Sequence, residues 1–97
     1  MQVPVPPLSL VFSQDSYQAD EFGTAEVSCT LTEGGTPISG ETITFTWDPG
    51  FGTQTETGTT NANGVANANI WFLDFWTCTV TATYENVTAT CTVEYSL

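Results

Sequence analysis

The chain has 97 residues and contains eleven aspartates and glutamates but no lysine, arginine or histidine, so its formal net charge is −11. Nucleic-acid binding needs a basic surface, and none can be assembled from these side chains. The sequence also lacks an imidazole to transfer protons and a cationic side chain to bind phosphate. We therefore expect no nucleic-acid partner, no cofactor and no enzymatic activity, although paired carboxylates alone can hydrolyse a glycoside.

A chain of this length corresponds to one domain with a modest core. Short apolar runs alternate with threonine, glycine and asparagine, and no window has the spacing of an amphipathic helix. No stretch reaches the roughly 20 apolar residues of a membrane span. No charged and apolar leader of the secretory kind opens the sequence. The pattern predicts a single all-β domain without membrane insertion.

The first residues, 1–7, are rich in proline and are predicted to form an extended arm or linker before a domain at 8–97. Alternating apolar residues at 8–12 predict the first strand. The apolar character of the whole stretch also fits a docking arm that adds a strand to the sheet of a neighbouring copy. The residues assigned to this arm are Val3, Val5, Leu8, Leu10 and Phe12.

After a polar, turn-rich loop at 14–23, the alternation of period two recurs to the end of the chain. A weaker strand at 53–57 is predicted to lie at an edge. Turns are expected at 48–50, 61–64 and 85–86. The side chains predicted to face the core are Ala25, Val27, Cys29, Leu31, Ile43, Phe45, Trp47, Ala66, Ala68, Ile70, Phe72, Cys78, Val80, Ala82, Tyr84, Ala89, Cys91, Val93 and Tyr95.

About seven short strands separated by turns predict an immunoglobulin-like sandwich of two antiparallel sheets. The segments GTAEVSCTLTEGGTPISGETITFTW, TGTTNANGVANANI and CTVTATYENVTATCTV resemble the bacterial immunoglobulin-like domain of the first group, the invasin and intimin type. The matching motifs are at 23–27, 35–45, 60–66 and 80–82. This resemblance implies a rod-like spacer in a surface adhesin, extracellular or at the cell surface, with tandem domains or copies of the same type as neighbours.

Three cysteines depart from the family's common pattern. Cys29 and Cys78 are at inward positions of the second and penultimate predicted strands, where immunoglobulin domains commonly join their sheets. A disulfide between them would close a loop of about fifty residues and stabilise the fold by about 4 kcal/mol. Cys91 also points inward and can compete with Cys78 for a disulfide to Cys29. It is expected to be either a buried free thiol or a bridge to another chain.

The aromatic run at 71–76 is the second departure and the best candidate for a contact surface. If the apolar residues that flank Trp71 and Phe75 in the sequence point inward, these two side chains face outward. There they can stack on a sugar ring or fill a pocket on another subunit. The alternative is that this loop folds back and closes the core. Asn86 begins an Asn-Val-Thr glycosylation sequon at a predicted hairpin tip.

Two functions of different classes fit these observations. The first is a structural module of an extracellular adhesin stalk or a self-assembling surface fibre, whose partners are neighbouring copies. The second is a carbohydrate-binding module that uses the aromatic residues near 71–76 to bind glycans. A glycosidase fragment is the third, and it requires two carboxylates that face one cleft.

Overall fold

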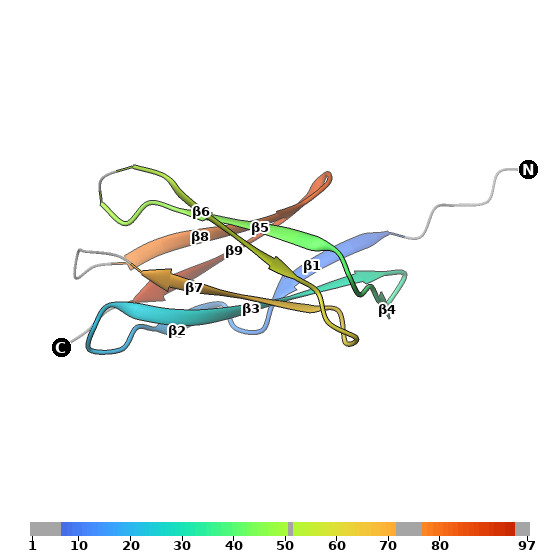
Figure 1. Cartoon of the computed structure of the whole chain (residues 1–97), viewed down its shortest axis with the longest axis horizontal. Coiled ribbons are helices and arrows are strands. Elements are labelled where there is room, and N and C mark those ends of the chain that lie inside the picture. The colour runs from blue at the N-terminus through green and yellow to red at the C-terminus, as the bar shows by residue number, and fades with distance from the viewer. Residues whose placement is uncertain (1–6, 51, 72–76, 95–97) are drawn as a thin grey trace, which may run out of the picture.

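The computed structural model describes residues 7–50, 52–71 and 77–94, and these residues form nine strands and no helix (Figure 1). The all-β sandwich predicted from the sequence is confirmed. The strands are β1 (Leu8–Phe12), β2 (Ser16–Gln18), β3 (Thr24–Glu33), β4 (Thr36–Pro37), β5 (Thr42–Trp47), β6 (Gln54–Thr59), β7 (Val65–Trp71), β8 (Thr77–Tyr84) and β9 (Val87–Glu94).

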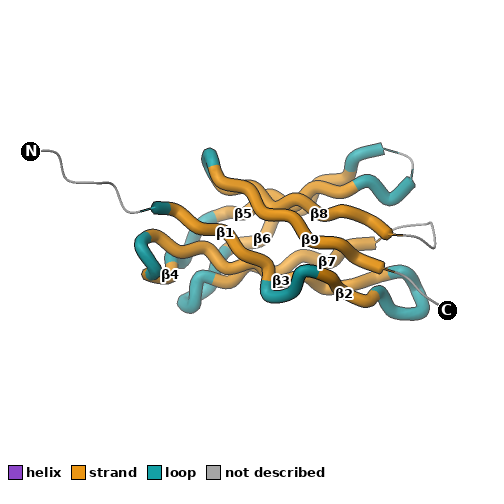
Figure 2. Tube along the Cα trace, turned by 180° about the vertical axis from the view of Figure 1, so that it is seen from behind, coloured by secondary structure: helices purple, strands orange, loops and turns teal. Residues whose placement is uncertain are grey.

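The strands form two layers, which Figure 2 shows from behind. In the four-stranded sheet, β3 pairs with β1, β4 and β7, all antiparallel. The five-stranded sheet has the order β2-β9-β8-β5-β6. The sequence predicted about seven strands, and the two additional ones, β2 and β4, are only three and two residues long. Such short segments carry too few positions for an alternation to be visible.

Strand β2 corrects the prediction of a loop at 14–23 and adds one parallel pairing to the antiparallel sheets. The chain leaves β1 in one sheet, crosses to the other sheet, and continues in β2. There β2 pairs with β9 in parallel, with Tyr17 opposite Val93. Tyr17 is buried, and its ring meets that of Phe12 edge to face at 6.4 Å between centroids. The polar neighbours of Tyr17 in the sequence concealed its place in the core.

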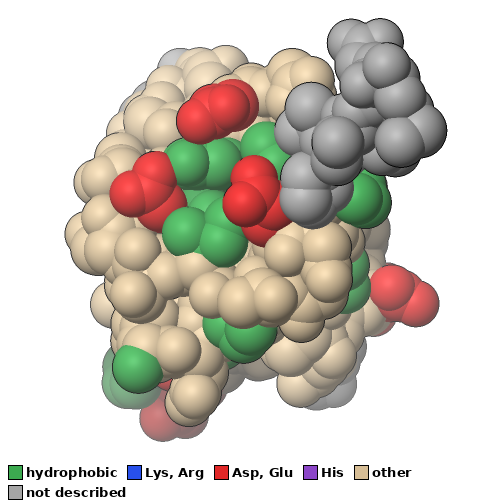
Figure 3. All heavy atoms as spheres, turned by 90° about the vertical axis from the view of Figure 1, so that its right-hand side faces the viewer, with side chains coloured by type: hydrophobic (Ala, Val, Ile, Leu, Met, Phe, Trp, Pro, Cys, Tyr) green, Lys and Arg blue, Asp and Glu red, His purple; other side chains and the backbone are tan. Residues whose placement is uncertain are grey.

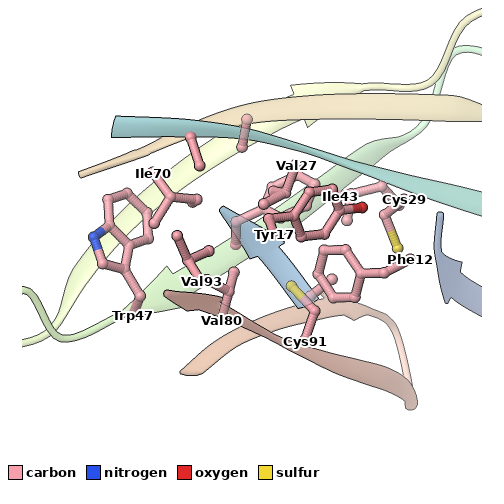
Figure 4. Packing of buried hydrophobic residues seen from close by; sticks show 14 of the residues in the cluster. Phe12, Tyr17, Val27, Cys29, Ile43, Trp47, Ile70, Val80, Cys91 and Val93 are labelled. Carbon is pink, nitrogen blue, oxygen red and sulfur yellow. The ribbon is translucent and has the colours of Figure 1, made fainter. Parts of the chain in front are cut away.

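The core lies between the two sheets and is built from the alternating faces that the sequence predicted (Figure 4). Phe12 from one sheet packs on Phe45 from the other, with ring centroids 6.1 Å apart. Two residues of the predicted core, Tyr84 and Ala89, are only partly buried because they lie near the tip of the β8–β9 hairpin. Phe72 and Tyr95 lie outside the described residues.

Three loops use the same side-chain cap, of which the one at Asp48 bonds the N–H groups of Gly50 and Gly52 at 2.8 and 3.1 Å, while the other two end in a glycine. The side-chain Oδ1 of Asn61 accepts the N–H groups of the second and fourth residues after it, at 2.8 and 3.1 Å. Asp20 does the same at 2.9 and 3.0 Å. Each of these two turns then closes at a glycine with positive φ, Gly23 at 76° and Gly64 at 77°. The Asx-x-x-Gly spacing fixes the shape of these turns locally, and the carbonyl of Gly64 also accepts the N–H of the core residue Leu31 at 2.8 Å.

The strand β1 also corrects the predicted docking arm. Leu8 pairs with Glu33 and Phe12 pairs with Cys29 of the same chain, and Leu10 and Phe12 are buried. Because these side chains fill the domain's own core, they are not free to dock on a neighbour. The docking arm is therefore limited to Val3, Val5 and their neighbours in residues 1–6, which lie outside the described residues.

Candidate functional site

All three cysteines are buried free thiols, so the structure does not support the predicted Cys29–Cys78 disulfide. Cys29 lies in β3 between Phe12 and Ala66 on the flanking strands. The thiol of Cys78 instead contacts the carbonyl of Asp48, at 3.5 Å, where β5 has ended. The two positions are thus at different levels along the sandwich. A disulfide needs Cα atoms within about 7 Å of each other.

Cys91 is a buried free thiol on β9. Burial, with smaller Coulombic contributions from Cys29 and Cys78, raises the pKa of Cys91 to about 12. Burial likewise raises the pKa of Cys29 to about 12 and also raises the pKa of Cys78. Thiols with such pKa values remain protonated at neutral pH and are poor nucleophiles. The cysteines therefore serve as small apolar core residues.

The aromatic end of the sandwich carries Trp47, Trp71 and Phe22. The indole Nε1 of Trp47 donates to the carbonyl of Trp71 at 2.7 Å, and the two rings meet edge to face at 6.4 Å between centroids. Trp71 is 36% exposed, in agreement with its predicted outward orientation. Phe75 lies outside the described residues. This end of the molecule therefore offers aromatic surface to a ligand or to another protein.

Phe22 was missed by the sequence analysis. It is 81% exposed at the turn between β2 and β3, where the side chain of Asp20 accepts its backbone N–H. A single aromatic residue inside a loop of polar residues and glycine is the signal that could have identified it, because such a residue has no strand alternation to place it in the core.

One edge of the sandwich is closed where β6 passes β7. A Cβ at Gly58 would lie 2.5 Å from the carbonyl oxygen of Asn67, so the two backbones approach more closely than a side chain permits. The carboxylate of Glu56 accepts the outward N–H of Asn69 at 3.1 Å. The indole of Trp47 covers the outward carbonyl of Trp71. Side chains thus occupy backbone groups that another strand would need.

The opposite edge is open where β1 lies beside β9. The carbonyl of Pro7 accepts the N–H of Gly34, and Ser13 donates its N–H to Ser28, both at 2.9 Å. The backbone N–H and carbonyl groups of the odd-numbered residues of β1 therefore point toward β3, because hydrogen bonds alternate along an antiparallel strand. The residues of β1 whose backbone groups point outward are Leu8, Leu10 and Phe12.

Over its first half, strand β9 also directs backbone groups outward. Thr92 donates its N–H to the carbonyl of Asp15 at 3.0 Å. The backbone N–H and carbonyl groups of the even-numbered residues of β9 therefore point away from β8. The strand β2 occupies this edge only opposite Thr92 to Glu94. Within the part of the chain that the structure describes, no backbone group pairs with the outward N–H of Thr88 or Thr90.

A small apolar surface lies beside this open edge, at the end of the sandwich where β1 begins. Figure 3 looks onto that end and shows hydrophobic side chains gathered among carboxylates. The phenol of Tyr84 donates a hydrogen bond to Glu41, and that bond raises the pKa of Tyr84. The partly buried hydrophobic residues that pack against the core are Leu8, Ile38, Tyr84, Val87 and Ala89.

Asn86 is exposed in the two-residue turn of the β8–β9 hairpin, the place where the sequon was predicted to lie. Its neighbour Glu85 has φ of 51°, a left-handed conformation that glycine or asparagine usually adopts in such turns. The position leaves the Asn86 amide accessible, and glycosylation there stays a prediction.

Across the described residues no group of three or more histidine, cysteine, aspartate or glutamate side chains is arranged to hold a metal ion. The same residues include no helix that is both long and apolar enough to cross a membrane.

The model of the family described as bacterial Ig-like domain (group 1) matches residues 7–96. This range includes both sheets and excludes most of the proline-rich arm. Comparisons with curated proteins and with solved structures give no match. The matching family is a structural one, found typically in bacterial surface proteins, and the fold and the motifs of this sequence agree with it. The chain belongs to the bacterial Ig-like domain (group 1) family.

Proposed function

We propose that this chain is a non-enzymatic structural module of an extracellular adhesin stalk or surface fibre, where it transmits tension from one end of its sandwich to the other. Its membership of a family of surface-protein domains supports the location. The direction of the strands supports the mechanical part. The strand β1 begins at one end of the molecule, and β9 ends at the other (Figure 1).

The parallel pairing of β2 with β9 is the observation that carries this proposal. Tension applied at the two termini pulls β2 and β9 in opposite directions along their own axes. Their hydrogen bonds are then loaded together in shear rather than opened one after another. These bonds include Thr92 N–H to Asp15 O at 3.0 Å and Ala19 N–H to Glu94 O at 2.7 Å. Simultaneous loading gives a high barrier to forced unfolding, which is governed by the unfolding rate.

Single-molecule pulling through the termini tests the proposal. The variant Thr92→Pro removes the N–H that bonds to Asp15, and it should unfold about three to ten times faster under load, because a backbone hydrogen bond contributes about 0.5–1.5 kcal/mol. Thr90→Pro is the matched control, since its N–H points to the same edge but has no partner among the described residues. Equal unfolding forces for both variants would show that the β2–β9 pair does not bear the tension.

A carbohydrate-binding module is the second candidate, and the exposure of Phe22 and Trp71 favours it. Aromatic rings of this size provide a face on which a sugar can stack. A glycan array should then give signals with the native chain that disappear in the variant Phe22→Ala. The control is Val11→Ala, because Val11 is also exposed but lies on β1. Signals that persist in Phe22→Ala would exclude this residue as the binding surface.

A further inference from the structure

Over the first half of β9, the outward backbone groups pair with no strand among the described residues. The edge is occupied by β2 from Thr92 onward, whereas Thr88 and Thr90 present their N–H and carbonyl groups to the side away from β8. An exposed edge of this kind is a template for pairing with another chain. The complementary backbone would lie in line with β2 and would extend the five-stranded sheet at the β9 side.

The surface beneath this edge is apolar. Val87 and Ala89 point toward the core from β9 but are only partly buried, and Leu8 lies close by at the start of β1. Figure 1 shows β1 and the β8–β9 hairpin separating toward this end. An added strand with apolar side chains would therefore cover these residues as well as pair with the backbone.

The proline-rich arm has the sequence of such a strand. Its residues alternate as Val3-Pro4-Val5-Pro6. In an extended strand, residues two apart direct their N–H groups to the same side. The N–H groups of Val3 and Val5 thus form one bonding edge, and the prolines, which have no N–H, form the other. Proline is tolerated in sheets at this kind of edge position.

The arm's own domain is a poor partner for it. A residue before proline is restricted to extended backbone, and in this arm that restriction applies to Val3, Val5 and Pro6. The carbonyl of Pro7 is already fixed by Gly34, so β1 leads the arm away along its own direction. A reversal toward the same chain's β9 would need a turn where the sequence opposes one. A second copy has no such restriction.

We propose that residues 2–6 of one copy add as an edge strand to β9 of a second copy, opposite residues 87–91. Five extended residues span about 17 Å, enough to pair along these five residues of β9. The arm has no charged side chain, so it approaches an acidic domain without repulsion. One face of the arm carries Val3 and Val5 and the other carries Pro4 and Pro6, so either strand direction places apolar side chains over Val87 and Ala89. This inference deepens the proposed function by naming the partner and the surface of a fibre.

The prolines also limit the contact to one strand. After the arm has paired with β9, its outer edge lacks N–H donors at Pro4 and Pro6, so a further strand cannot continue the sheet. Each domain therefore accepts one arm and offers one arm. A contact between two different surfaces, repeated from copy to copy, gives an ordered chain or a closed ring rather than an unlimited sheet.

Sedimentation equilibrium of the full chain, from micromolar to millimolar concentration, tests the proposal. The variant Val3→Pro/Val5→Pro removes both donors and keeps the arm apolar and extended. We expect its self-association to be at least about tenfold weaker, because two backbone hydrogen bonds are lost. The matched control Pro4→Ala changes the outer edge only and should associate within about threefold of the native chain.

Amide hydrogen exchange locates the contact. In the associated native chain, the amides of Thr88 and Thr90 should be protected, and in the double variant they should exchange freely. The amide of Thr92, bonded to Asp15 in the same chain, should be protected in both. A native chain that remains monomeric, a double variant that associates as strongly as the native chain, or a double variant whose melting temperature is lower at a dilution where the native chain is also monomeric would each overturn the inference. The pulling experiment uses single molecules, so its result is independent of this one.

Discussion

The two long edges of the sandwich differ in how their backbone groups are treated. Where β6 meets β7, a glycine permits close approach, a carboxylate accepts one outward N–H and an indole covers one outward carbonyl. Where β1 meets β9, the outward N–H groups of Thr88 and Thr90 have no partner in the described residues. Both edges belong to strands of ordinary length and composition, so strand propensity does not explain the difference.

The comparison shows that edge protection comes from individual side chains placed beside the strands. Natural sheets protect exposed edges because such edges pair with other chains. In this domain such protection is found on the side of β7, where Gly58, Glu56 and Trp47 each act on one backbone group. The proposed pairing with an arm of another copy requires an open edge of this kind.

Replacing Gly58 should have the largest effect on this comparison. In Gly58→Val, the new side chain meets the Asn67 carbonyl at a distance that forces β6 and β7 apart. We expect a loss of about 3 kcal/mol in the free energy of unfolding, comparable to the cost of inserting extra atoms into a well-packed core. Urea denaturation followed by tryptophan fluorescence measures it. The control is Thr90→Val on the open edge, which should change stability by less than about 0.5 kcal/mol. Equal losses would mean that the edges are not different.

Alkaline pH should weaken the core behind the open edge, where Cys29 and Cys91 lie on β3 and β9. Burial raises the pKa of both thiols to about 12 from an ordinary value of 9.0. The unfolded chain therefore releases protons first. The contribution of the two protonated thiols to the free energy of unfolding is fully present below pH 9. It is lost as the pH rises toward the pKa values of the thiols in the folded chain. We expect the free energy of unfolding to decrease by about 2–3 kcal/mol between pH 8 and 10, measured in urea melts with reductant present.

The variant Cys91→Ala provides the comparison for this pH dependence. It costs some stability at every pH, but it should flatten the decrease above pH 9, because one of the titrating thiols is gone. A decrease of unchanged slope in Cys91→Ala would show that other groups cause the alkaline loss. Reductant is needed throughout, so that oxidation of the exposed thiols in the unfolded state does not distort the measurement.

The cap that Glu56 provides for the Asn69 N–H should have a smaller effect. Glu56→Ala leaves that N–H to water, and we expect a loss of about 1 kcal/mol in thermal or urea unfolding. The control is Glu26→Ala, an exposed glutamate of β3 directly opposite Asn69 in the register. Removing either carboxylate reduces the net charge by the same amount, so the difference between the variants isolates the cap. If Glu26→Ala is the more harmful change, the cap has no stabilising role.

The sequence predicts the sandwich well because its core positions alternate with period two and its turns carry local signals. Val27, Ile43 and Val80 were placed in the core from alternation alone, and all are fully buried. Gly64 was placed in a turn by the residues before it. These properties depend on neighbours in the chain, so they can be read without knowing which strands pair.

The edges could not be predicted in the same way. The cap of Glu56 on Asn69 and the parallel pairing of Tyr17 with Val93 join residues that are far apart in the sequence or that lack an alternating pattern. The register decides which backbone groups point outward, and a shift by one residue would exchange them. The disulfide prediction shows the same weakness, since two inward cysteines on suitable strands still lie at different levels along the sandwich.

A substitution that relieves the left-handed backbone at the tip of the β8–β9 hairpin should have the smallest effect on the free energy of unfolding, and this effect should be stabilising. Glu85 has φ of 51°, where a residue with a Cβ costs about 1–2 kcal/mol. Glu85→Gly removes that cost but increases the freedom of the unfolded chain, so we expect a net gain of about 0.5 kcal/mol. The hairpin carries the open edge, yet Thr88 and Thr90 keep their orientation in this variant. Its melting temperature should therefore rise slightly while its self-association in sedimentation equilibrium stays unchanged. A change in association without a change in stability would mean that the hairpin tip, rather than the edge of β9, contacts the neighbouring copy.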